Sequence, residues 1–130
     1  MKKLNKILLI DDDDLINFIH KKIISVSGCA NEIVYVRSAM DGIEHLKTTD
    51  TIPDLILLDL NMPAIDGWGF LEQRKKININ PSPKIIILTT SVNPDDRIKA
   101  SKIKEVDDYL NKPLNPETIT EVINKHFEHL

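Results

Sequence analysis

Residues 7–14 read Ile-Leu-Leu-Ile-Asp-Asp-Asp-Asp, so that four aliphatic side chains run directly into four aspartates. Two further unbroken aliphatic runs occur at residues 55–58 and 85–88. An unbroken run of this length is typical of a strand that is buried on both faces, as in a parallel sheet. Weaker runs at residues 33–36 and 106–110 complete a set of five predicted strands.

Helical patterns lie between these strands and after the last one. Ile16, Ile19 and Ile23 have helical spacing, which predicts a first helix that turns this stripe toward the sheet and ends near residues 27–28. We expect His20, in the same helix, to be partly exposed. The other predicted helices begin at capping residues, namely Ser38, Asp66, Asn93 and Asn115. Five strands alternating with five helices predict an α/β fold, a three-layer αβα sandwich around a parallel sheet.

The composition restricts the class of protein. The chain has 130 residues, which suits one domain over residues 1–130, and its formal net charge of −3 lacks the basic excess of a nucleic-acid-binding protein. No apolar stretch approaches the ~20 residues that cross a membrane, and the N-terminal apolar run is too short for a signal peptide. The single cysteine, Cys29, cannot form an internal disulfide, which favours a cytoplasmic location.

Polar residues follow the predicted strands at their carboxyl ends, where open parallel sheets form their sites. These residues are Asp11, Asp12, Asp59, Asn61, Thr89 and Lys112. Two carboxylates ~4 Å apart repel by ~4 kcal/mol at an effective dielectric of about 20, so a fold that gathers them protonates one or places a cation between them. A few hard oxygen ligands favour Mg²⁺. Such a site suits phosphoryl transfer, with a carboxylate as the nucleophile. We expect Asp13 and Asp14 to cap the first helix instead, because acids favour helix N-termini.

Four motifs resemble the receiver domain of two-component response regulators, and they follow that family's order over essentially the whole chain. They are Ile-Leu-Leu-Ile-Asp-Asp at residues 7–12, Asp-Leu-Asn-Met-Pro at 59–63, Leu-Thr at 88–89 and Asp-Tyr-Leu-Asn-Lys-Pro at 108–113. The resemblance implies a flavodoxin/CheY-like fold with the strand order 2-1-3-4-5. The chain departs from the family at Glu105, where the turn before the last strand usually has glycine.

The resemblance implies a role for each matching residue of the site. Asp59 would accept a phosphoryl group from a phosphohistidine on a sensor histidine kinase or a histidine phosphotransfer protein. The side chains of Asp12 and Asp59, with the backbone carbonyl of Asn61, would ligate Mg²⁺, for which Mn²⁺ is a substitute. Asp11 would act on the ion mainly through water. Lys112 would pair first with Asp59 and then with the phosphate.

The resemblance also implies a switch, formed by Thr89 and Tyr109. The Thr89 hydroxyl would turn toward a phosphate oxygen, and Tyr109 would move inward into the space that Thr89 leaves. That motion would alter the face that binds a downstream protein. We therefore expect a signalling protein rather than an enzyme, one that only assists its own phosphorylation and dephosphorylation. A stand-alone receiver is expected, because the last predicted helix reaches the C-terminus; a receiver cut from a hybrid kinase and a phosphorelay intermediate are the alternatives.

A haloacid-dehalogenase-like phosphatase is the main alternative from the enzyme class. That family also has Asp-x-Asp after its first strand, with a later Thr and Lys, and Asp11 would then be the nucleophile. This alternative gives no role to the motif at residues 59–63. An adaptor that keeps only the fold is a second alternative, which the intact metal ligands disfavour.

Leu15 and Phe18 point away from the apolar stripe of the first predicted helix. At about 100° per residue, Phe18 falls roughly 160° from Ile16. Single exposed apolar residues are common and need no function. The alternative hypothesis is that Leu15 and Phe18 dock the helical partner that carries the phosphohistidine.

Overall fold

The computed structural model describes residues 3–127, so both ends of the predicted domain 1–130 lie outside the described residues. Strands and helices alternate along the chain, as predicted. The strands are β1 (Leu4–Ile10), β2 (Ala30–Val36), β3 (Leu55–Leu58), β4 (Lys84–Thr89) and β5 (Val106–Asn111). The helices are α1 (Asp14–Ser27), α2 (Ala39–Thr48), α3 (Gly67–Lys75), α4 (Pro94–Ser101) and α5 (Pro116–Phe127). None of the helices within residues 3–127 has the length and apolar character needed to cross a membrane.

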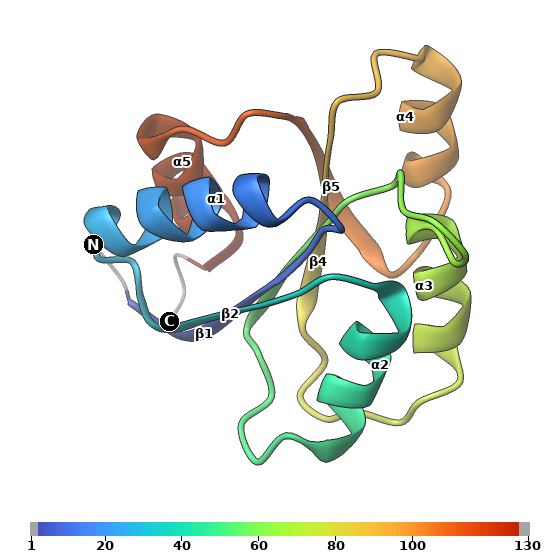
Figure 1. Cartoon of the computed structure of the whole chain (residues 1–130), viewed down its shortest axis with the longest axis horizontal. Helices are drawn as coiled ribbons and strands as arrows, with labels where there is room; N and C mark the ends of the chain where they lie inside the picture. The colour runs from blue at the N-terminus through green and yellow to red at the C-terminus, as the bar shows by residue number, and fades with distance from the viewer. Residues whose placement is uncertain (1–2, 128–130) are drawn as a thin grey trace.

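The strands form one parallel sheet in the order β2-β1-β3-β4-β5, which confirms the order that the resemblance implies. Helices α1 and α5 cover one face of this sheet, and α2, α3 and α4 cover the other (Figure 1). The predicted three-layer αβα sandwich is therefore confirmed. Because all neighbouring strands are parallel, their carboxyl ends meet along a single edge.

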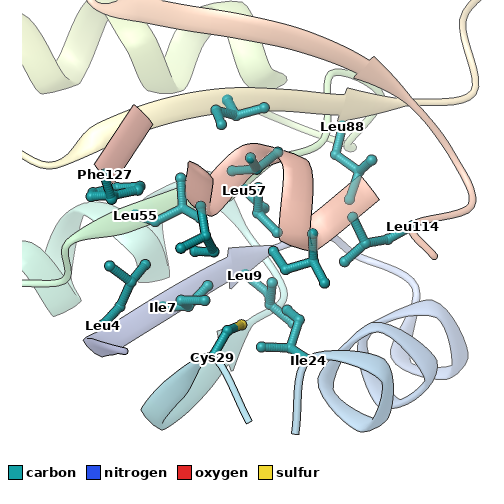
Figure 2. Close-up of a cluster of buried hydrophobic side chains, with 14 residues drawn as sticks. Leu4, Ile7, Leu9, Ile24, Cys29, Leu55, Leu57, Leu88, Leu114 and Phe127 are labelled. Atoms are coloured by element: carbon teal, nitrogen blue, oxygen red, sulfur yellow. The ribbon is translucent and has the colours of Figure 1, made fainter. Parts of the chain in front are cut away.

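The unbroken aliphatic runs are explained by burial on both faces of the sheet. In β1, Ile7 and Leu9 pack toward α1 and α5, while Leu8 and Ile10 pack toward α2 and α3. All four side chains are at most 2% exposed. Figure 2 shows the cluster on the side of α1 and α5. Burial of each such side chain contributes about 1.5–3 kcal/mol, so these runs fix the strands whose ends carry the polar residues.

Helix α1 presents a different face to the core than the sequence pattern predicts. Its buried positions are Asn17, His20 and Ile24. Ile19 is 38% exposed, and Ile16 and Ile23 are only partly buried, so the predicted stripe is off by one position; the expectation that His20 is partly exposed is wrong. One residue corresponds to about 100° of helix rotation, so a shift by one position turns a different face inward. Two polar atoms at these buried positions, Asn17 Nδ2 and His20 Nε2, tolerate burial because each has a hydrogen-bond partner.

The four consecutive aspartates at the start of α1 have different roles. The Asp13 side chain accepts hydrogen bonds from the backbone N–H groups of Leu15 and Ile16, so it caps the helix as predicted. Asp14 lies in the first turn and pairs with Arg37 at 2.9 Å. The helix N-terminus and Arg37 therefore engage these two carboxylates, which leaves the preceding two for the edge of the sheet.

Helix α3 packs closely against the loop that follows β3. The Gly67 N–H donates to the Leu60 carbonyl at 3.0 Å. A Cβ atom at Gly67 would lie 2.5 Å from the Asp59 carbonyl oxygen and 2.8 Å from the Leu60 Cα. Both neighbours are backbone atoms, which cannot yield as a flexible side chain does. The missing side chain at Gly67 thus permits α3 to support the Asp59 loop.

We expect Gly67→Ala to lower the free energy of unfolding by about 1–3 kcal/mol, because the added methyl group meets backbone on the Asp59 loop. Urea denaturation measures this loss. Gly69→Ala is the comparison, because its Cβ would lie 2.5 Å from the Ile65 Cγ2, a side-chain rather than a backbone atom, so we expect a smaller loss there. A Gly67→Ala protein as stable as the wild type would show that the close approach is unimportant.

Candidate functional site

The carboxyl edge of the sheet brings three aspartates and one lysine together. One carboxylate oxygen from each of Asp11, Asp12 and Asp59 lies within 4.8 Å of the others. The ammonium group of Lys112 lies 2.5 Å from Asp11 Oδ2 and 3.3 Å from Asp59 Oδ1. The predicted convergence of residues from the ends of three strands is therefore present.

Backbone hydrogen bonds beyond the strand ends hold two of these residues in place. The Asp59 N–H donates to the Ile10 carbonyl at 2.9 Å, which extends the pairing of β3 with β1. The Lys112 N–H donates to the Thr89 carbonyl at 2.8 Å and does the same for β5 and β4. The pairing of the strands thus fixes the backbone positions from which the side chains of Asp59 and Lys112 extend.

Burial makes the electrostatics of this cluster strong. Asp11 and Asp59 are each 5% exposed. Burial raises the pKa of Asp59 above its ordinary value; the charge of Lys112 opposes this change, and the neighbouring Asp11 adds to it. Burial alone would lower the pKa of Lys112, but its contacts with Asp11 and Asp59 outweigh that effect and raise it. Lys112 therefore stays protonated and pairs with two of the three clustered carboxylates.

A second layer of polar side chains comes from α1. Asn17 Nδ2 donates to the Asp11 carbonyl at 2.8 Å, and His20 Nε2 accepts from the Leu114 N–H at 3.3 Å. The sequence analysis missed both residues as part of the site. Their spacing of three positions, with the buried Ile24 four further on, would have indicated a polar patch on the inward face of the helix.

The remaining predicted residues lie around the cluster. Thr89 is fully buried at the end of β4, and its hydroxyl oxygen accepts from the Ser91 N–H at 3.2 Å. Tyr109 is buried in β5, with the Arg97 guanidinium 4.6 Å from its ring centre. Asn61 is exposed, and a hydrogen bond from its backbone N–H counters the rise in the pKa of Asp59. Within residues 3–127, the Thr89 hydroxyl shares no hydrogen bond with the three aspartates.

A parallel sheet in this strand order, with an acidic cluster and a lysine at its carboxyl edge, has the architecture of a CheY-like α/β domain. The sequence model of the response regulator receiver domain matches residues 7–124. The chain belongs to this family of two-component signalling domains. Receiver domains of the family are phosphorylated by histidine kinases.

Two curated relatives illustrate how receivers are combined with other domains. The chain is 30% identical over 119 residues to the sensor histidine kinase CheAY of Helicobacter pylori, covering 92% of this chain and 14% of that protein. It is 32% identical over 120 residues to the nitrate/nitrite response regulator NarL of Escherichia coli, covering 92% of this chain and 53% of that protein. The chain thus spans less than two thirds of each relative.

A solved structure agrees over nearly its full length. A two-component response regulator from Cytophaga hutchinsonii superposes with a TM-score of 0.83 at 33% identity, covering 95% of this chain and 97% of that chain. The fold and the receiver assignment are confirmed by this similarity and by the family match. The alternative of a haloacid-dehalogenase-like phosphatase with Asp11 as nucleophile finds no support in these comparisons.

We expect Asp59→Asn to raise the free energy of unfolding by about 1 kcal/mol at pH 7 without divalent cations. Burial raises the pKa of Asp59 in the folded protein, so its ionisation destabilises the fold as pH rises from the ordinary value of 3.8 through the raised value. Lys112 keeps its partner Asp11 in the variant.

Urea unfolding at several pH values tests this expectation. The advantage of Asp59→Asn should shrink as pH falls toward 3.8, where the wild-type carboxyl is increasingly protonated in both states. Asp50→Asn, at an exposed aspartate, is the control and should change little. A wild-type protein that is the more stable of the two at pH 7 would contradict the argument.

Proposed function

We propose that this chain is a receiver over residues 1–130 in which Asp59 accepts a phosphoryl group from the phosphohistidine of a histidine kinase or a histidine phosphotransfer protein. The observation that carries the proposal is the gathering of Asp11, Asp12 and Asp59 within 4.8 Å, with Lys112 bridging two of them. On this proposal the chain is a signalling protein that only assists its own phosphorylation and dephosphorylation. Its location in the cytoplasm stays a prediction.

Asp59 supplies the nucleophile in the proposed transfer. A carboxylate oxygen of Asp59 forms a bond to phosphorus while the bond between phosphorus and the donor imidazole nitrogen breaks. The imidazole leaves with that electron pair and takes up a proton. Lys112, 3.3 Å from Asp59, is placed to follow the negative charge from the carboxylate to the phosphoryl oxygens.

The donor set fits Mg²⁺, and Mn²⁺ as its substitute. The three carboxylates offer hard oxygen ligands, and Asp12 is exposed, so water has access. Asp12 and Asp59, with the Asn61 carbonyl, would hold the ion. Asp11 Oδ2 pairs with Lys112 and Asp11 Oδ1 accepts from the Asp13 N–H, which supports a role for Asp11 through water. A bound divalent ion supplies positive charge to the transferring phosphoryl group.

Thr89 and Tyr109 form the proposed switch. Phosphorylation would turn the Thr89 hydroxyl away from the Ser91 N–H and toward a phosphoryl oxygen. The Tyr109 ring would then move into the vacated space and leave its packing against the exposed Arg97. Because Arg97 lies on α4 and Tyr109 on β5, this motion would change the face of α4, β5 and α5 that a downstream protein reads.

We expect acetyl phosphate with Mg²⁺ to add one phosphoryl group to the wild-type protein and none to Asp59→Asn. Intact-mass spectrometry measures the addition, and peptide mapping after borohydride reduction locates it. Omission of Mg²⁺ should lower the labelling rate by at least roughly a hundredfold, because Lys112 alone then compensates the negative charges that face the phosphodonor. Labelling of Asp11 instead of Asp59 would restore the phosphatase alternative.

The outward face of α1 is the proposed docking surface for the partner that carries the phosphohistidine. Leu15 and Phe18 are 65% and 66% exposed, and Ile19 is 38% exposed beside them. The helix begins at Asp14, directly after the acidic cluster. Three apolar side chains next to the site suit a helical partner, which would bury them while its histidine reaches Asp59.

We expect Phe18→Glu to slow phosphotransfer from a histidine phosphotransfer protein by roughly tenfold or more while labelling by acetyl phosphate is unchanged. Stopped-flow or gel-based transfer assays measure both rates. Val26→Glu is the matched control, because Val26 is 73% exposed on the same helix but lies about 12 Å further from its start. If both donors slow together, or neither does, Phe18 is not a docking residue.

A further inference from the structure

The inward face of α1 carries two polar side chains that the proposed function does not use. Asn17 is 1% exposed and His20 is 3% exposed. Asn17 donates to the Asp11 carbonyl, and His20 Nε2 accepts from the Leu114 N–H at 3.3 Å. One face of α1 thus contacts the backbone on both sides of the acidic cluster, after β1 and after β5.

The bond to Leu114 bears directly on the position of Lys112. Leu114 follows Lys112 by two residues, and its side chain lies in the core between α1 and α5 (Figure 2). The Lys112 N–H is held by the Thr89 carbonyl of β4. The segment of residues 112–114 is therefore held by β4 at Lys112 and by α1 at Leu114. A shift of this backbone would move the ammonium group away from Asp59.

The contact demands a hydrogen-bond acceptor at His20. Nε2 accepts only when it carries no proton, and burial, together with the charge of Lys112, lowers the pKa of His20, although Asp11 opposes this. An apolar side chain of similar size would fill the space but leave the Leu114 N–H buried without a partner. Such a loss is avoided in folded proteins, often by a local shift of the backbone.

We propose that His20 is a positioning residue of the phosphotransfer site, because its hydrogen bond to Leu114 holds the segment from which Lys112 reaches the phosphoryl group on Asp59. The inference rests on the proposed function, since it requires that Lys112 acts in the transfer. His20 itself touches neither the phosphodonor nor the phosphoryl group.

A comparison of His20→Met with His20→Gln tests this role. Met fills a similar space with only a weak thioether acceptor, whereas the Gln side-chain oxygen falls near the position of Nε2. Labelling by acetyl phosphate is measured over a range of Mg²⁺ concentrations, and Mg²⁺ affinity is measured separately by calorimetry. We expect His20→Met to lower the maximal rate roughly tenfold or more, with Mg²⁺ affinity changed less than about threefold, because Lys112 contacts the phosphoryl group rather than the ion. His20→Gln should restore the rate to within about threefold of the wild type.

Controls separate positioning from general stability. Ile43→Val, at a buried position of α2, lowers stability away from the segment and should leave the rate unchanged. A His20→Met protein labelled at the wild-type rate, or a His20→Gln protein as slow as His20→Met, overturns the proposal. If His20→Met does not fold, His20→Gln is compared with His20→Asn, whose shorter amide does not reach Leu114, and equal rates overturn it. Absence of labelling on Asp59 in the wild type contradicts the proposed function instead.

Discussion

Repulsion among three carboxylates is the interaction on which the rest of this structure depends. Asp11, Asp12 and Asp59 gather within 4.8 Å, and two of them are almost fully buried. Left alone, such a cluster would open or take up a proton. The ammonium group of Lys112 offsets part of the charge, and the aliphatic strands beneath keep the chain from relaxing. The fold therefore maintains a site with an excess of negative charge, which an added cation would stabilise.

The strand order determines which side chains can reach the acidic cluster. β1 and β3 are neighbours, so the short side chains of Asp11 and Asp59 meet directly after their strands. β5 is separated from β3 by β4, and two strand spacings amount to roughly 10 Å. Only a long side chain spans much of that gap, which explains a lysine at position 112. A long side chain is also sensitive to where its backbone begins, so the contacts that fix the end of β5 matter to the site.

Local signals in the sequence predicted most of the fold. The unbroken aliphatic runs located the buried strands, and capping residues such as Ser38 and Asp66 located helix starts, because each depends on residues close in the chain. The buried face of α1 was predicted wrongly for the opposite reason. Asn17 donates to the Asp11 carbonyl just before the helix, but His20 tolerates burial because the backbone N–H of Leu114, far along the chain, supplies its partner. No pattern within the helix reveals that partner.

The acidic site was predicted because parallel strands share one edge, whereas the state of its charges required three dimensions. The sequence places Asp11 and Lys112 101 residues apart, and only the folded chain shows that they form the shortest ion pair of the cluster. Asp59 forms the longer ion pair with Lys112, at 3.3 Å, and its burial raises its pKa. Of the two buried carboxylates, Asp59 is thus the one whose charge is less compensated, so a cation beside it, or transfer of its charge onto phosphoryl oxygens, stabilises the site most there.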